Sequence, residues 1–352
     1  MPAVTNFHNK SFDDGTLLKL EILEDYISEW LPVFLYSPQV SDIYIYDLYC
    51  GPGCDTCGIP GSPMRIYKVL NTYADSIKNK KIHVWFNDMD NEKTATCAKI
   101  DKPQKVQCCF TSKPADKCFE AIPSYKFPRG SAHFFYVDPC GIVDYGMVLE
   151  TIYRLGISEA LLFIPASFIS RFYEQESFSS RLPNFPPNVN QKSILKEFCK
   201  YCKTEFNLEK TFFSYFTIKK QTFRQIHGLI FMTRHPRGLE KFLNVTWKKS
   251  TNGESNFALT GDMPENGQCF LSDDFSMTSK IPSFQNMLRE KIISRELLTN
   301  ADVYLFTIQS GHIIKHAKSV VTKLFKDKII LNNVPISYDN AFKKEPISII
   351  LS

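Results

Sequence analysis

The stretch Asp47-Leu48-Tyr49-Cys50-Gly51-Pro52-Gly53 decides the fold, because it places a carboxylate and two glycines directly after a strand-like run at residues 43–46. Glycine lets the backbone turn sharply and lie against a ligand, since it has no Cβ that would clash. In open α/β sheets the ligand crevice lies outside the carboxyl ends of the strands. The stretch therefore predicts a ligand-binding turn, although a single D-x-x-x-G-x-G match is also typical of ordinary tight turns.

Two later strand-like runs repeat this design. Residues 83–86 lead into Asp88 and Asp90, and residues 132–137 lead into Asp138. Parallel strands all point the same way, so their acidic ends would line one crevice. The alternation of strand and helix patterns over residues 43–165 is typical of a parallel sheet with crossover helices. The sequence thus predicts a Rossmann-like α/β sheet with helices on both faces.

Composition favours a soluble globular protein of about two domains, because 43% of the 352 residues are hydrophobic and 22% are charged. No apolar run approaches the roughly 18 residues of a membrane span. The first 14 residues lack the apolar segment of a secretory signal, so we expect a cytoplasmic protein. Eleven cysteines in such a chain favour free thiols. The pairs Cys54/Cys57 and Cys199/Cys202 could together bind zinc, but their unlike surroundings favour no metal.

The chain divides into two predicted domains. Residues 1–250 form the α/β domain, with an N-terminal helix and a lid-like insertion near 170–192. Late strands, one of them at 243–247, would close its sheet. Residues 251–266 carry Gly, Asn, Ser and Pro and are predicted to be a linker. Residues 267–352 contain three helix patterns followed by two apolar strips, which is the order of a winged helix.

The turn after the first strand is better suited to S-adenosylmethionine than to a dinucleotide. Pro52 removes an N–H donor that a pyrophosphate would use, and the next helix begins only after residues 54–61. A sulfonium and an ammonium group match the carboxylate of the turn. The acid after the second strand would accept the ribose hydroxyls. The predicted cofactor-binding residues are Asp47, Gly51, Gly53 and Asp88.

The sequence Asp138-Pro139-Cys140-Gly141 is predicted to hold the methyl acceptor. Proline fixes the backbone directly after the carboxylate, so the side chain and the nearby carbonyls can be aimed rigidly at an amine. Methyl transfer from a sulfonium requires an in-line nucleophile and stabilisation of its developing positive charge. We therefore predict Asp138 and Pro139 as the catalytic residues.

Several segments together resemble the three-Cys-motif partner proteins (TcmP). They are DLYCGPG at 47–53, GSP at 61–63, FNDMD at 86–90, FFYVDPCG at 134–141 and LIFMTRHPRG at 229–238. The resemblance implies a class I methyltransferase-like domain followed by a winged helix. It also implies a phage-type companion protein that carries three cysteines of the radical-SAM kind.

The D-P-x-G loop resembles, more widely, the D-P-P-Y and D-P-F-G loops of amino-methyltransferases that act on nucleic-acid bases. This chain has Cys140 and Gly141 where a proline and a stacking aromatic residue would stand. Stacking of a flipped base would then require Tyr136 or Tyr145 instead.

The last predicted helix carries the predicted nucleic-acid-binding residues, Lys315, Lys318, Lys323 and Lys326. A winged helix places such a helix in the major groove, with its lysines on phosphates. The helix has no arginine, so bidentate readout of guanine is not expected. The alternative is a solvated face in a protein-interaction domain.

Three functions follow from these patterns. The first is an S-adenosylmethionine-dependent methyltransferase that acts on an amino group of DNA or RNA. The second is a non-catalytic methyltransferase-like scaffold that binds nucleic acid and a companion protein. The third is a nuclease that holds Mg²⁺ with the aspartates, which the glycine-rich turn disfavours.

Overall fold

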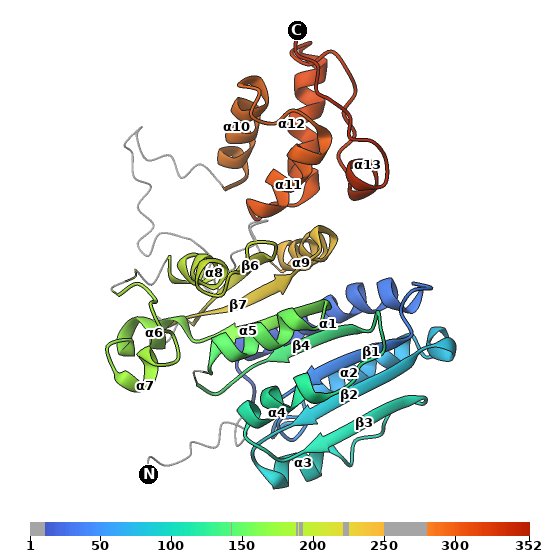
Figure 1. The fold of residues 1–352 in the computed structure, drawn as a ribbon, viewed down its shortest axis with the longest axis vertical. Helices are drawn as coiled ribbons and strands as arrows, with labels where there is room; N and C mark the ends of the chain where they lie inside the picture. The colour runs from blue at the N-terminus through green and yellow to red at the C-terminus, as the bar shows by residue number, and fades with distance from the viewer. Residues whose placement is uncertain (1–10, 142, 188, 190–192, 221–224, 250–279) are drawn as a thin grey trace.

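The computed structural model describes residues 11–352 except 142, 188, 190–192, 221–224 and 250–279 (Figure 1). Its centre is a seven-stranded sheet with the order β3-β2-β1-β4-β5-β7-β6. Strands β1 to β5 are parallel, and β7 is antiparallel to both of its neighbours. The strands are β1 (Asp42–Asp47), β2 (Lys81–Asn87), β3 (Val106–Thr111), β4 (Ala132–Val137), β5 (Ile157–Ile164), β6 (Phe212–Lys220) and β7 (Gln225–Thr233).

Helices cover both faces of this sheet and form two hydrophobic cores. One core lies between the sheet and α1, α2, α3 and α9, and the other lies between the sheet and α4, α5, α6 and α8. Neighbouring strand residues point to opposite faces, so Ile45 enters the first core and Tyr46 the second. The helices are α1 (Asp14–Leu35), α2 (Ser62–Thr72), α3 (Asn91–Cys97), α4 (Ala115–Ala121), α5 (Tyr145–Arg154), α6 (Ala166–Phe172), α7 (Glu176–Ser179), α8 (Ile194–Glu205) and α9 (Pro236–Lys248), with short 3-10 turns η1 (Ser76–Asn79) and η2 (Ile122–Ser124).

The predicted strand at 243–247 is wrong, because these residues belong to α9. Pro236 lies in the first turn of α9, where a backbone N–H would have no partner within the helix, so its lack of an N–H costs no hydrogen bond. The His235 side chain accepts the N–H of Arg237 and caps the helix. The predicted lid-like insertion forms the end of α6 and α7, and it buries Leu182 and Phe185 in the core beside α8.

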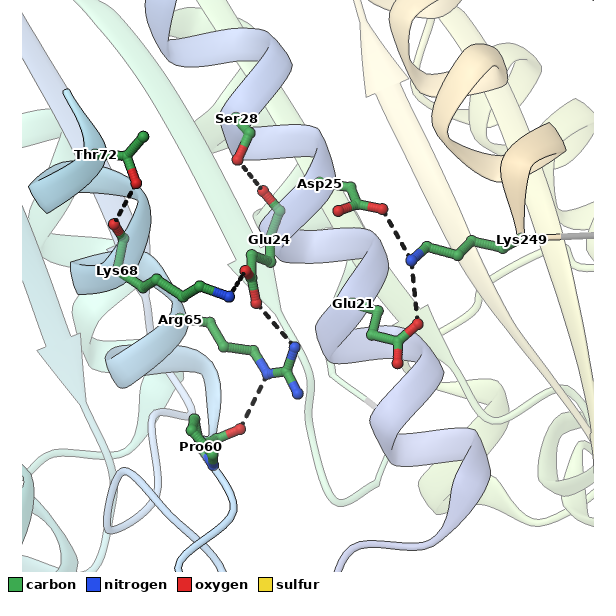
Figure 2. Close-up of polar contacts among 9 residues, drawn as sticks. All are labelled: Glu21, Glu24, Asp25, Ser28, Pro60, Arg65, Lys68, Thr72 and Lys249. Carbon is green, nitrogen blue, oxygen red and sulfur yellow. Dashed lines mark hydrogen bonds and ion pairs between the residues drawn. The ribbon is translucent and has the colours of Figure 1, made fainter.

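Ion pairs fix α1 between two other helices (Figure 2). Glu24 pairs with Arg65 at 2.9 Å and with Lys68 at 2.5 Å, and both cations belong to α2. Lys249, at the end of α9, pairs with Asp25 at 2.9 Å and with Glu21 at 3.1 Å. The register of α1 against the sheet is therefore set from both sides, which also sets the position of its N-terminal turns.

A buried carboxylate joins α1 to the sheet. Glu159 of β5 is 6% exposed and accepts hydrogen bonds from the Tyr26 hydroxyl and, at 2.7 Å, from the Thr233 hydroxyl. Burial raises the pKa of Glu159 to about 7, although both hydroxyls and Lys241 lower it. Between about pH 4.5 and 7 the native protein therefore holds a proton that the unfolded chain has released, so this group lowers the stability as the pH rises.

We expect Glu159→Gln to remove this loss of stability. The free energy of unfolding of the variant, relative to the wild type, should rise by on the order of 2 kcal/mol between pH 5 and pH 8. Urea unfolding at the two pH values measures it. Glu150→Gln is the control, because this side chain is 59% exposed. Its free energy of unfolding should differ from that of the wild type by the same amount at pH 5 and at pH 8. A pH-independent difference for Glu159→Gln would contradict the prediction.

The C-terminal region has the helix order of a winged helix. It contains α10 (Lys280–Ile293), α11 (Asn300–Gln309), α12 (Ile314–Lys326) and the short α13 (Tyr338–Phe342). A capping box of Thr299 and Asp302 begins α11. The two predicted apolar strips meet only at an isolated antiparallel bridge between Ile330 and Leu351, and α13 lies between them. The predicted linker at 251–266 lies outside the described residues.

The winged helix packs on α9, beside the β6–β7 edge of the sheet (Figure 1). The Trp247 indole N–H donates to the Gly311 carbonyl at 3.0 Å, and the Tyr304 hydroxyl donates to Glu240 at 2.8 Å. Among the helices of the described segments, none combines the length and the apolar character that a membrane span requires.

Candidate active site

The structure brings the three predicted acidic strand ends together. Asp47 is the last residue of β1 and pairs in register with Phe86 of β2 and Tyr136 of β4. Asp88 and Asp138 each follow their register partner by two residues and so flank Asp47 at the carboxyl edge. In Figure 1 the arrows of β1 to β4 all point toward this edge. The charges of Asp138 and Asp88 both raise the pKa of Asp47, as expected for carboxylates at the same edge of a sheet.

Asp47 is fully buried, and its environment favours a ligand. Burial raises its pKa to about 7; the Ser62 hydroxyl and the Tyr49 N–H act in the opposite direction. Its Oδ2 atom has no hydrogen-bond partner among the residues that the structure describes. A buried polar atom without a partner is costly. A bound donor or cation would satisfy it.

Asp88 is half-buried and fixes the glycine turn. Its Oδ2 accepts the Gly51 N–H at 3.1 Å, and its Oδ1 accepts the Asp90 N–H at 2.9 Å. Gly51 has a φ of 60°, a conformation in which glycine is favoured. A carboxylate offers about four acceptor sites. Each oxygen of Asp88 can therefore still accept a hydroxyl, as a ribose diol would require.

Gly53 is favoured by its backbone conformation and by its close contact with Ile100. Its φ is 98°, and a Cβ at this position would lie 2.3 Å from the Ile100 Cδ1 atom. Gly61, just before α2, donates its N–H to the Gly53 carbonyl at 2.8 Å and so closes the excursion at 54–60. Gly53 thus shapes the turn through Ile100, a contact that the sequence pattern did not indicate.

Lys19 of α1 is the residue that sequence reasoning missed. Its Nζ donates to both carboxylate oxygens of Asp138, at 2.8 and 2.7 Å, and lies 3.9 Å from the centre of the Phe163 ring. The Tyr136 hydroxyl also donates to Asp138, at 2.9 Å. A signal was present in the sequence, because Lys19 lies on the apolar stripe of α1, three and four residues before Ile22 and Leu23.

Neither of the two residues that base stacking at this loop would require, Tyr136 or Tyr145, is placed for it. Tyr136 is 1% exposed and holds Asp138, and Tyr145 is 0% exposed and packs edge-on against Phe198. Neither ring has a face available to a base. The Lys19 ammonium, which is bonded to Asp138, also lies over the aromatic ring of Phe163 in β5.

Within the described ranges, no three His, Cys, Asp or Glu side chains are grouped as metal ligands. The cysteines of both CxxC pairs are free thiols: Cys199 and Cys202 are buried in α8, whereas Cys57 is exposed. This arrangement gives no support to the zinc or Mg²⁺ alternatives.

The predicted nucleic-acid-binding lysines share the exposed face of α12. The opposite face, which includes Ala317, Val321 and Leu324, is buried in the core of the winged helix. A pocket of about 330 Å³ lies between α12 and residues 333–340, and Lys318 and Thr322 form part of its wall. The exposed lysines are Lys315, Lys318, Lys323 and Lys326.

The strand order, with an antiparallel β7 inserted between β5 and β6, confirms the predicted Rossmann-like class I methyltransferase sheet. A family model described as a GMT-like wHTH domain matches residues 260–335, which confirms the winged-helix region. Comparison with curated proteins gave no significant match.

Solved structures with a similar fold include Trm1 from Pyrococcus horikoshii in complex with S-adenosyl-L-methionine. This likeness has 10% identity and a TM-score of 0.39, and it covers 66% of this chain and 59% of that chain. A protein from Legionella pneumophila gives 8% identity, a TM-score of 0.40 and coverages of 63% and 86%. A putative class I S-adenosylmethionine-dependent methyltransferase from Listeria monocytogenes has 10% identity and a TM-score of 0.32. This likeness covers 65% of this chain and 62% of that chain. Likenesses this distant carry no argument about activity.

Proposed function

We propose that this protein is an S-adenosylmethionine-dependent methyltransferase that acts on an amino group of a nucleic acid. The observation that carries the proposal is the buried Asp47 oxygen without a partner, which lies between Asp88 and Asp138 at the carboxyl edge of the sheet. None of the described residues places a cation against Asp47, so this negatively charged edge is suited to a ligand that brings its own positive charge.

The residues at this edge fit the cofactor. The Asp47 carboxylate would bind the methionine ammonium and attract the sulfonium, while the Gly51 turn would leave room for the backbone to approach the ligand. Asp88 retains acceptor sites for the ribose hydroxyls. The cofactor supplies an electrophilic methyl group. Asp138 and the rigid Pro139 would orient the acceptor nitrogen toward this methyl group.

Binding of S-adenosylmethionine to the purified protein, measured by calorimetry, tests this proposal together with transfer of a labelled methyl group to DNA or RNA. Binding and transfer would support an enzyme. The absence of cofactor binding would contradict it and leave the non-catalytic scaffold. The ion pair of Asp138 with Lys19 favours that second candidate, because it engages both oxygens of the predicted catalytic carboxylate.

The winged helix would bring nucleic acid to the protein through the lysines of α12. We expect Lys318→Ala and Lys323→Ala to weaken DNA binding about equally for all sequences, because phosphate contacts carry no base information. Each substitution should reduce the slope of log K against log salt concentration by about 0.9. Fluorescence anisotropy at several salt concentrations measures this slope. Lys200→Ala is the matched control, since this exposed lysine lies on α8. An unchanged slope in both α12 variants would contradict phosphate binding.

We further propose that the chain belongs to the three-Cys-motif partner family, with the domain division 1–250, 251–266 and 267–352 and a cytoplasmic location. The motifs that carry this proposal include the turn at 47–53 and the loop at 138–141. Its implied companion is a phage-related protein with three radical-SAM-type cysteines. Copurification of the two proteins when expressed together tests the pairing, and independent elution would contradict it.

A further inference from the structure

The ammonium group of Lys19 lies in a site that has the chemistry of an amine-binding pocket. Asp138 provides a carboxylate that accepts two hydrogen bonds from Nζ, and Phe163 provides an aromatic face 3.9 Å from the same atom. Carboxylates and aromatic faces both attract N–H groups that carry positive charge. The Lys19 and Asp138 side chains are 11% and 19% exposed, so the pocket lies at the surface of the crevice and is largely desolvated.

Both walls of this pocket are fixed without Lys19. The Tyr136 hydroxyl donates to Asp138 at 2.9 Å, and Pro139 restricts the backbone that follows. Phe163 lies in β5, which is paired with β4 and β7, and its ring stacks on His227 with a centroid distance of 5.3 Å. Lys19, in contrast, reaches the pocket through a flexible four-carbon chain. Its side chain can leave while the walls stay in place.

We propose that Asp138 and Phe163 bind the exocyclic amino group and the ring of a nucleobase, and that Lys19 fills this pocket until the base displaces it. The inference rests on the proposed function and assigns the acceptor end of the same site. A nitrogen that takes the place of Nζ would bond to Asp138 and lie about one stacking distance above Phe163. Phe163 then supplies the aromatic face that is missing at Gly141.

This arrangement selects amino bases against keto bases. An amino group donates to Asp138, whereas a carbonyl oxygen at the same position faces the carboxylate with no proton between them. A site built to bond one polar group rejects the analogue that lacks it much more strongly than an apolar pocket can. Cytosine and uracil, or adenine and hypoxanthine, differ in this way at one ring position.

The test is a ligand-detected NMR titration of these four bases with the full chain in the absence of cofactor. Lys19→Ala and Lys19→Met should bind cytosine or adenine about tenfold more tightly than the wild type, because the competing ammonium is gone. Uracil and hypoxanthine should gain nothing. The double variant Lys19→Ala/Phe163→Leu should bind cytosine or adenine about tenfold more weakly than Lys19→Ala alone, because leucine fills the volume but offers no aromatic face. Lys200→Met, an exposed lysine of α8 that is not bonded to α1, is the control and should match the wild type.

Equal gains for keto and amino bases, or no gain in either Lys19 variant, would overturn the proposal. Adenine bound in the cofactor pocket is distinguished because Phe163→Leu would leave it unchanged. S-adenosylhomocysteine binding is measured separately. If S-adenosylhomocysteine does not bind, the proposed cofactor is contradicted. The base titrations still test whether Asp138 and Phe163 bind an amino base. Loss of S-adenosylhomocysteine binding in both Lys19 variants with no gain for amino bases would assign Lys19 to the cofactor carboxylate and also overturn the proposal.

Discussion

Asp47→Asn is expected to weaken S-adenosylmethionine binding about a hundredfold while raising the stability of the free protein at pH 8. Binding falls because a neutral amide cannot balance the ammonium and sulfonium charges. Stability rises because burial lifts the pKa of Asp47 to about 7, so that at pH 8 the wild type must hold a buried charge with an unpartnered oxygen. The gain should be on the order of 2 kcal/mol. Calorimetry and urea unfolding measure the two effects.

The opposite signs of these effects separate a ligand-binding carboxylate from a structural one. Asp144 is the matched control, because it caps α5 by accepting the Met147 N–H at 3.0 Å, and asparagine can replace it in that role. Asp144→Asn should therefore change neither quantity appreciably. A loss of stability in Asp47→Asn with unchanged cofactor affinity would show that Asp47 serves only the fold.

The pKa of Asp47 also makes cofactor binding depend on pH. A cationic ligand prefers the ionised carboxylate, whose fraction grows as the pH rises through about 7. We expect the Kd of S-adenosylmethionine to fall about tenfold between pH 5.5 and pH 7 in the wild type, a range in which the amino group of the cofactor stays protonated. The same measurement on Asp47→Asn should show a flat profile over this range. A wild-type profile without this change would contradict the involvement of Asp47.

The sequence predicted the acidic edge because its signals are local. Each carboxylate follows its own apolar run directly, and parallel strands bring such ends together by topology alone. The same local reasoning failed at residues 243–247. Their β-branched and aromatic side chains are typical of a strand, but the cap at His235 and Pro236 begins a helix whose apolar stripe, including Leu239 and Phe242, packs on the sheet. Tertiary packing outweighs local preference there.

The contacts that complete the site could not be predicted, because they join distant parts of the chain. Lys19 and Asp138 are 119 residues apart, and nothing in the spacing of either motif indicates that they meet. The approach of Phe163 depends on the order of β4 and β5 in the sheet, and the approach of Lys19 depends on the register of α1. Patterns of single elements contain neither quantity.

Gly53→Ala is expected to lower the free energy of unfolding by about 2–5 kcal/mol. A φ of 98° is strained for any residue with a Cβ, which accounts for about 1–2 kcal/mol. The new methyl group would lie 2.3 Å from the Ile100 Cδ1 atom, and overpacking of this kind costs about 1–3 kcal/mol more. Urea unfolding measures the loss. Gly58→Ala is the control, because its φ of 78° is similarly strained but nothing lies within 4 Å of the added carbon.

Ile100→Val separates the packing role of Gly53 from a role in cofactor binding. Valine lacks the Cδ1 atom, so the double variant Gly53→Ala/Ile100→Val should be more stable than the sum of the single effects by about 1–2 kcal/mol. The clash is then relieved, and only the backbone strain remains. If the double variant also binds S-adenosylmethionine with the same affinity as Ile100→Val alone, the role of Gly53 is to let Ile100, just after α3, pack against the turn. If the effects of the two substitutions on the free energy of unfolding simply add, the packing role is contradicted. Direct contact of Gly53 with the ligand is then the favoured interpretation.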